Sequence, residues 1–298
     1  MLSDCPFDIR ENVPLAPFTT WRIGGAARFF AEAASCELPK ILLWAKSKNI
    51  PYCVIGGGSN ILVRDCGIDG LVVRVKDEIE SVKINRDFVE ANAGARLPAL
   101  CMLLAKSGIA GFEFLAGIPG TVGGAVFMNA GAGGERRREI SDVFLGASLF
   151  SPASGVFEAD KNFMRFSRRF SALQDSGDVL ISAKFAVEKF ENPADILSRV
   201  KKSLEDRAAR QPENPRNAGS VFKACGGVPA GILIDRAGLK GLRVGGASVS
   251  LKHANWIENS GSATSADVEE LIAKIKRAVF EKFNLRLEEE VKILSAKV

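Results

Sequence analysis

Three consecutive glycines limit more strongly than any other feature what this chain can fold into. They lie in the stretch VIGGGSNILV, residues 54–63, between an apolar run at 52–55 and the strand-favouring residues Ile61, Leu62 and Val63. A Rossmann unit or a P-loop needs its glycines to open a helix. The order here is strand, glycine loop, strand, which excludes both. Such a loop can aim backbone N–H groups at an anion, or it can be a tight turn that needs positive φ.

A second glycine-rich segment makes the first more informative. It is AGIPGTVGGAVFMNAGAGG, residues 116–134. Bare main chain of this length lets an extended ligand lie along it, and Thr121 can donate a hydrogen bond to a phosphate. The alternative is a crossover that packs tightly on a sheet. Two such loops in one region of mixed strands and helices favour a dinucleotide that is held without a Rossmann unit.

Composition excludes several classes of protein. The chain has 298 residues, a net charge of +5, one histidine and six cysteines without a C-x-x-C pair. This length allows about two domains, and we expect no nucleic-acid partner because aromatic-basic and zinc-finger patterns are missing. We expect no metal site, since one histidine would leave almost only carboxylates as ligands. There is no apolar run long enough for a membrane span and no signal peptide, so we predict a cytoplasmic protein.

The hydrophobic pattern predicts an α+β fold. Two helices are expected from their apolar periodicity and their end signals. The first is 97–108, closed by Gly108, and the second is 266–283, capped by Thr264 or Ser265. The proline-containing segment 211–217 is a linker, and the main domain boundary is placed there. Further elements follow from periodicity: strands at 26–32, 52–55, 179–190 and 285–294, a hairpin turning at 152–155, and helices at 37–49 and 194–210.

At this point the residues resemble a known family. GGGSN and IPGTVGGA are similar to the flavin-binding fold of the vanillyl-alcohol-oxidase superfamily. The whole chain resembles more closely the family of UDP-N-acetylenolpyruvoylglucosamine reductases, through GSVFK, AGLKG with GGASVS, KHANW and LEEEV. The resemblance implies two FAD-binding subdomains, 1–76 and 77–210, and a substrate-binding α+β domain, 211–298.

The resemblance also implies cofactors and a reaction. FAD would be bound non-covalently, NADPH would be the co-substrate, and the enolpyruvyl ether of UDP-N-acetylglucosamine would be reduced to UDP-N-acetylmuramate for peptidoglycan synthesis. Cys66 and Cys101 stay open as alternatives for covalent attachment. The implied FAD-binding residues are Gly56, Gly57, Gly58, Ser59, Asn60, Gly117, Ile118, Gly120, Thr121, Gly123, Gly124 and Ala125.

Three catalytic residues follow from the matched motifs. Hydride addition leaves negative charge beside the substrate carboxylate, which must be stabilised and protonated. The motifs imply Ser220 as the proton donor, Glu290 as its acidic partner and Arg165 as the stabilising cation. Without the resemblance, Ser220 would be interpreted as a turn residue and the other two as solvated charges.

The sequence departs from the family pattern near two of these sites. Met164 stands where the family usually has tyrosine, and Ala224-Cys225 replaces the usual Asn-Pro. The neighbouring Arg168 and Arg169 are alternatives for the arginine position, for which Arg165 is favoured. Lys223, Asn255 and Gln211 are candidate substrate contacts, and each could equally serve packing or capping.

Two other functions remain open on the sequence. One is an FAD-dependent oxidase or dehydrogenase of the same superfamily with another substrate. The other is a sugar-nucleotide or nucleic-acid binding module without catalytic activity, for which Met164 and Ala224 are the hint. A monomer is expected. The choice between NADPH and NADH has no sequence signal, because no Rossmann motif reads the extra phosphate.

Overall fold

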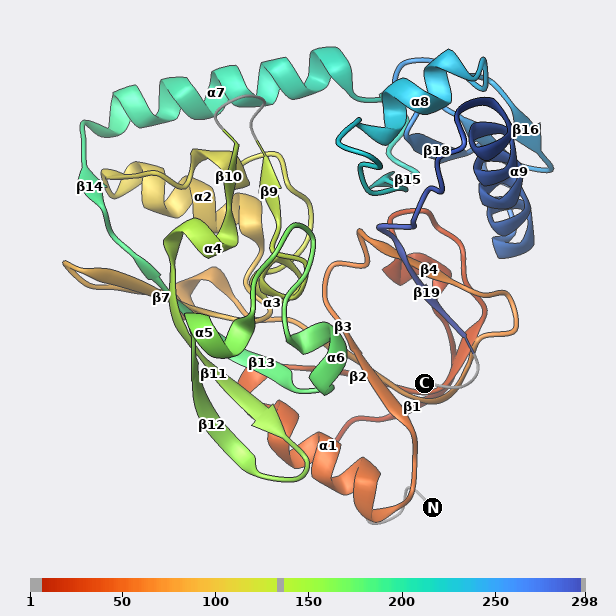
Figure 1. Ribbon diagram of the computed structural model, residues 1–298. Coiled ribbons are helices and arrows are strands. Elements are labelled where there is room, and N and C mark those ends of the chain that lie inside the picture. The colour runs from red at the N-terminus through yellow and green to blue at the C-terminus, as the bar shows by residue number, and fades with distance from the viewer. Residues whose placement is uncertain (1–6, 133–136, 296–298) are drawn as a thin grey trace. The chain divides into compact units, whose positions relative to one another are not determined.

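The computed structural model describes residues 7–132 and 137–295, and these combine β-sheets with helices as expected (Figure 1). They divide into two compact units, each assembled from separate stretches of chain. Unit 1 comprises 7–9, Ala31–Gly57 and Val72–Arg207 apart from 133–136, and unit 2 comprises Arg10–Phe30, Gly58–Leu71 and 208–295. The predicted division at residues 76 and 210 stays a prediction. Residues 133 and 134 of the second glycine segment lie outside the described residues.

Unit 1 is built around an antiparallel sheet of strand order β12-β11-β13-β7-β6. The predicted hairpin is confirmed, since β11 and β12 flank the turn at 152–155 and pair Phe150 with Val156. Alternate residues such as Leu149 and Phe185 are buried, as expected for a sheet with one face in the core. The strands are β6 (Lys83–Ile84), β7 (Phe88–Asn92), β11 (Phe144–Ser151), β12 (Gly155–Asp160) and β13 (Val179–Ala186).

The helices of unit 1 follow their sequence signals. In α2 (Leu97–Lys106), Leu97, Leu100, Cys101 and Leu104 form the buried stripe, and the chain leaves the helix at Gly108 with φ of 75°. The helix α3 packs on β13 and β7, and α1 contacts β11. The other helices are α1 (Leu38–Ser47), α3 (Val122–Phe127), α4 (Ile140–Val143), α5 (Lys161–Met164), α6 (Leu173–Ser176) and α7 (Pro193–Arg210).

Eight further strands lie in the described part of the chain before the linker, apart from β4. Four strands, of which β2 and β5 have eight residues each, pair in the order β1-β2-β5-β3, and β1 is antiparallel to β2. The strand β8 pairs with β14, and β9 pairs with β10. Their bounds are β1 (Arg10–Pro14), β2 (Ala26–Ala33), β3 (Tyr52–Ile55), β5 (Ile68–Val75), β8 (Ile109–Ala110), β9 (Gly131–Ala132), β10 (Arg138–Glu139) and β14 (Lys189–Phe190).

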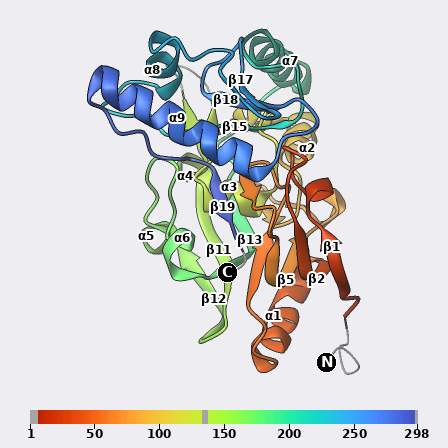
Figure 2. The ribbon, with the colours of Figure 1, turned by 90° about the vertical axis from the view of Figure 1, so that its right-hand side faces the viewer.

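Unit 2 combines a second antiparallel sheet, of order β15-β18-β17-β16, with the long helix α9 (Ser265–Phe283). Figure 2 shows α9 beside the strands of this sheet, and α9 contacts β16, β17 and α8. Its stripe from Val268 to Val279 enters a core that also contains Trp21, Leu62 and Phe222. The remaining elements are β4 (Ile61–Val63), β15 (Asn217–Ser220), α8 (Ala230–Arg236), β16 (Arg243–Val244), β17 (Ala247–Val249), β18 (Trp256–Asn259) and β19 (Lys292–Leu294).

Two predicted strands are too long. The strand expected at 179–190 ends at Ala186, because the chain then leaves the sheet and Phe190 pairs with Ile109 instead. The strand expected at 285–294 is regular only in β19, since its earlier part makes an isolated bridge from Glu289 to Phe222. Leu287 and Val291 of this segment are buried in the core of unit 2.

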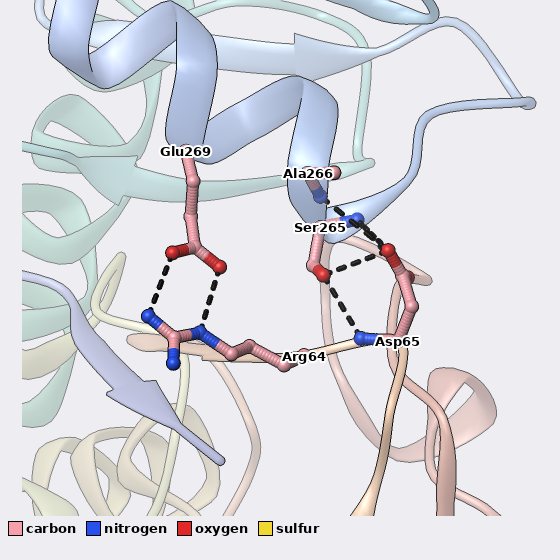
Figure 3. A network of polar contacts seen from close by, with 5 residues as sticks. All are labelled: Arg64, Asp65, Ser265, Ala266 and Glu269. Atoms are coloured by element: carbon pink, nitrogen blue, oxygen red, sulfur yellow. Dashed lines mark hydrogen bonds and ion pairs between the residues drawn. The ribbon is translucent and has the colours of Figure 1, made fainter.

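The N-terminus of α9 is held by the loop that follows β4 (Figure 3). Thr264 is the N-cap, as one of the two predicted alternatives. Ser265 instead bonds Asp65: its N–H donates to the carboxylate at 2.9 Å and its hydroxyl at 2.8 Å, while the hydroxyl accepts from Asp65 N–H at 2.9 Å. Beside them, Arg64 makes a bidentate ion pair with Glu269, in which Nε and Nη2 donate to the two carboxylate oxygens at 2.9 and 2.8 Å. Asp65, which is distant in sequence, therefore accepts from the first N–H groups of this helix in addition to the Thr264 cap.

We expect Asp65→Ala to destabilise the protein much more than Glu269→Ala. The first change leaves the N–H groups of Ser265 and Ala266 without their carboxylate acceptor, and loss of such a cap costs about 0.5–2 kcal/mol. The second removes an ion pair between an exposed arginine and a half-buried glutamate near the surface, which contributes little. Urea unfolding of both variants gives the two free energies. Equal losses would show that the carboxylate does not act as a cap.

Candidate active site

The two glycine segments meet within unit 1. The loop after β3 packs directly on the main chain that enters α3: a Cβ on Gly57 would lie 2.8 Å from the Cα of Gly120, and one on Gly56 would strike the Thr121 hydroxyl oxygen. Real Cβ atoms do not tolerate such distances, so glycine is required at both positions for steric reasons. The predicted strand, glycine loop, strand order is confirmed by β3 and β4.

The main chain on the far side of this contact is held in place by its neighbours. Leu97 N–H donates to Gly120 C=O at 3.1 Å, and Val122 N–H donates to Ala95 C=O at 2.9 Å. Thr121 is buried and caps α3, with its hydroxyl oxygen accepting from Gly124 N–H at 3.4 Å. The loop of Gly56 and Gly57 therefore rests on a rigid segment.

One glycine of the second segment faces open space. A Cβ on Gly124 would meet nothing nearer than the Thr121 hydroxyl oxygen at 3.8 Å, whereas one on Gly123 would approach Ala93 C=O at 3.2 Å. Main chain that is bare and uncrowded at Gly124, next to the crowded pair Gly57 and Gly120, forms a cradle that a dinucleotide can contact closely. The residues present therefore fit FAD.

The remaining predicted cofactor residues are placed by different contacts. Gly58 has φ of 65°, and its C=O accepts from Thr20 N–H at 3.0 Å in unit 2. The side chain of Arg207, in α7, lies against Gly117, where a Cβ would overlap its Nε and Cδ atoms. The sequence analysis missed Arg207, because the charge pattern of α7 does not distinguish it from its neighbours. Ser59 and Asn60 follow Gly58 in unit 2, and Ile118 and Ala125 both lie in the second glycine segment, in unit 1.

Ser220 and Glu290 lie on adjacent segments of unit 2. Glu290 N–H donates to the C=O of Val221 at 2.7 Å, and Lys223 N–H donates to Glu288 C=O at 2.9 Å. A bulge in β15 and Gly219, with φ of 74°, bend the chain just before Ser220. The predicted proton donor Ser220 and its predicted partner Glu290 therefore lie on hydrogen-bonded neighbouring segments, although they are far apart in sequence.

The two glutamates beside Glu290 are engaged elsewhere. Glu289 accepts from Lys276 Nζ at 2.8 Å, and Glu288 lies 3.5 Å from Lys223 Nζ. The Lys223 side chain therefore contacts the glutamate segment. These contacts do not distinguish the three glutamates of LEEEV, and the catalytic role of Glu290 stays a prediction.

Asn255 holds the segment that directly follows Ser220. It is buried, and its side-chain amide bonds the main chain of Phe222 in both directions, accepting at 3.0 Å and donating at 2.9 Å. Its own C=O accepts from Val221 N–H at 2.9 Å. These contacts support the alternative that the sequence analysis left open, in which Asn255 serves packing. Gln211 is half-buried directly after α7.

Arg165 belongs to unit 1, in a left-handed conformation with φ of 44° at the end of α5. Such a conformation costs a non-glycine residue roughly 1–3 kcal/mol, and residues of this kind concentrate at functional sites. Its guanidinium lies 3.4 Å from the Asp175 carboxylate, and both side chains are exposed. The preceding Met164 is fully buried, so the residue that replaces the family tyrosine serves the core.

The turn after Lys223 is defined by glycines. Cys225 and Val228 exchange both main-chain hydrogen bonds, at 3.0 and 2.9 Å, around Gly226 and Gly227. Both glycines have positive φ, 56° and 76°, which is typical of a type I′ turn. Ala224-Cys225, which replaces the family's Asn-Pro, therefore leads into a tight two-residue hairpin.

His253 is the only histidine of the chain. Burial lowers the pKa of its imidazole, and the nearby Lys240 charge lowers it further. The unfolded state, with a pKa of about 6.5, then binds more protons than the native state below that pH. We expect stability to fall as the pH drops below about 6.5 towards the lower pKa of the folded state. Urea unfolding of the His253→Gln variant should show a smaller loss over this range, and an unchanged pH slope would contradict the assignment.

Residues 7–132 and 137–295 contain no helix that is long and apolar enough to cross a membrane. In the same residues, no group of three or more histidine, cysteine, aspartate or glutamate side chains could hold a metal ion.

Comparisons with known proteins agree with this geometry. The model of the "FAD binding domain" family matches residues 27–159, and that of the "UDP-N-acetylenolpyruvoylglucosamine reductase, C-terminal domain" family matches 211–294. The reductase of Parasynechococcus marenigrum is 40% identical over 96% of both chains, and that of Streptococcus pyogenes serotype M18 is 42% identical with the same coverage. The crystal structure of the Thermus caldophilus reductase superposes with a TM-score of 0.80 at 34% identity, covering 96% of this chain and 99% of that one.

The fold and the glycine cradle define this protein as an FAD-containing oxidoreductase. With 40% identity over nearly its whole length, the chain belongs to the UDP-N-acetylenolpyruvoylglucosamine reductase family. Its function lies in the synthesis of peptidoglycan precursors. The predicted α+β fold, with an FAD-binding region and a C-terminal domain, is confirmed.

Proposed function

We propose that this protein uses NADPH to reduce the enolpyruvyl ether of UDP-N-acetylglucosamine to UDP-N-acetylmuramate. Family membership supports the substrate class. The observation that carries the proposal is the 2.7 Å hydrogen bond from Glu290 N–H to Val221 C=O. It holds the segment of Glu290 beside the segment of Ser220. A proton donor and its partner must be held at fixed separation to protonate one carbon.

The residues that would hold FAD are those of the cradle, chiefly Gly56, Gly57, Gly120, Thr121 and Gly124. When bound, this group supplies hydride transfer from NADPH to the methylene carbon of the substrate. We propose that it is bound without a covalent link. Burial raises the pKa of the Cys101 thiol to about 12, so one of the two cysteines left open is protonated and unreactive at neutral pH.

The protein's own residues act on the charge that hydride addition creates. Negative charge develops on the substrate carbon beside the carboxylate, and Ser220 donates a proton to that carbon from its hydroxyl group. Glu290 shares the proton with Ser220, and Arg165 stabilises the charge on the carboxylate. Lys223 and Gln211 remain candidate contacts to the sugar nucleotide. Asn255 acts on the substrate through the strand of Ser220.

The proposal is tested with the purified full-length protein. It should be yellow, should release its flavin into solution on acid precipitation, and should oxidise NADPH only when the enolpyruvyl sugar nucleotide is added. Oxygen-dependent peroxide formation with an alcohol, or a colourless protein, would contradict it. Gel filtration tests the expected monomer, and the cytoplasmic location stays a prediction.

A further inference from the structure

The last residue of the glycine loop contacts the main chain of Glu290. Asn60, which the sequence analysis assigned to the cofactor, donates from its side-chain Nδ2 to the C=O of Glu290 at 3.2 Å. Its own C=O accepts from Lys292 N–H at 3.0 Å. From there β4 and β19 run parallel, with Ile61 paired to Lys292 and Val63 to Leu294.

Glu290 is thereby held from two sides in unit 2. Its N–H donates to Val221, next to Ser220, and its C=O accepts from Asn60. The first bond sets its place against the strand of the proton donor. The second comes from the loop that contributes the cradle glycines earlier in its sequence. Of these two hydrogen bonds, the one to Val221 joins main-chain atoms only, whereas the one from Asn60 comes from a side chain. A single substitution can therefore remove the second bond but not the first.

We propose that Asn60 is a positioning residue for Glu290 in the reaction. This inference rests on the proposed function, because it assumes that Glu290 shares the proton of Ser220. When the Nδ2 donor is removed, the Glu290 carbonyl loses that hydrogen bond and the segment at 289–291 can shift. A displacement of about 1 Å in such a group costs roughly 100-fold in rate. Only the step that uses Glu290 should be affected.

The test separates the two half-reactions in Asn60→Ala and Asn60→Asp, since a carboxylate cannot donate to the carbonyl. With FAD saturating, rapid mixing with NADPH measures flavin reduction, and mixing the reduced protein with the enolpyruvyl nucleotide measures its reoxidation. We expect reduction within about 3-fold of the wild type and reoxidation slowed roughly 10- to 100-fold. Asn85→Ala, at an exposed asparagine before β7, is the matched control and should change neither.

A double-mutant cycle identifies the route of the effect. If Asn60 acts through Glu290, then Asn60→Ala should slow reoxidation little further in a Glu290→Gln background. Additive losses would overturn the inference, as would equal slowing of both half-reactions or a normal rate in Asn60→Ala. The proposed function fails separately, if the reduced wild-type protein is not reoxidised by the enolpyruvyl nucleotide.

Discussion

Ser220→Ala is expected to leave flavin reduction by NADPH intact and to slow reoxidation by the enolpyruvyl nucleotide about 100- to 10,000-fold. This is the usual contribution of a positioned general acid. Alanine cannot donate a proton, so the negatively charged substrate carbon is not protonated. Stopped-flow absorbance of the flavin follows each half-reaction in turn.

The structure indicates that this substitution is gentle. Ser220 is half-buried at the end of β15, and the strand is held by main-chain bonds and by Asn255, none of which involves the Ser220 hydroxyl group. Stability should therefore change little. Ser262→Ala, at an exposed serine of the same unit, is the matched control. Turnover of Ser220→Ala at the control rate would remove Ser220 from the mechanism.

Gly57→Ala is expected to weaken FAD binding and to destabilise the protein even without FAD. The new Cβ would lie 2.8 Å from Gly120 Cα, so one main-chain segment must move. Overpacking of this kind costs roughly 1–3 kcal/mol. Thermal unfolding of the protein stripped of flavin measures this loss directly, and titration with FAD measures the affinity.

Gly124→Ala separates cofactor contact from packing. Its Cβ would have room in the protein, and alanine within a helix is favoured over glycine by about 0.5–1 kcal/mol. The flavin-free variant should therefore be at least as stable as the wild type. Its FAD affinity should fall roughly 5- to 150-fold if the ligand presses on this main chain, which corresponds to about 1–3 kcal/mol. Unchanged FAD affinity would place the cofactor elsewhere.

The apolar periodicity and the capping residues, which are local in the sequence, predicted the helices well. Helix α9 was expected from its stripe and from a cap at Thr264 or Ser265; the stripe is found, and the N-cap is Thr264. Strand ends were predicted less well, because pairing partners decide them: β13 stops at Ala186, where the chain turns to pair Phe190 with Ile109. The roles assigned to Arg165, Ser220 and Glu290 came from family motifs and stay predictions.

The amino-acid sequence alone specified where the main chain carries no side chain, because the absence of a Cβ is a property of each glycine itself. It also specified the helices, whose hydrogen bonds and buried stripes are local in the chain. Tertiary contacts alone determined which distant segments share a unit and that Asn60 bonds Glu290, 230 positions away. The physical reason is that such a hydrogen bond depends on the packing of the whole unit, which no neighbouring residue encodes.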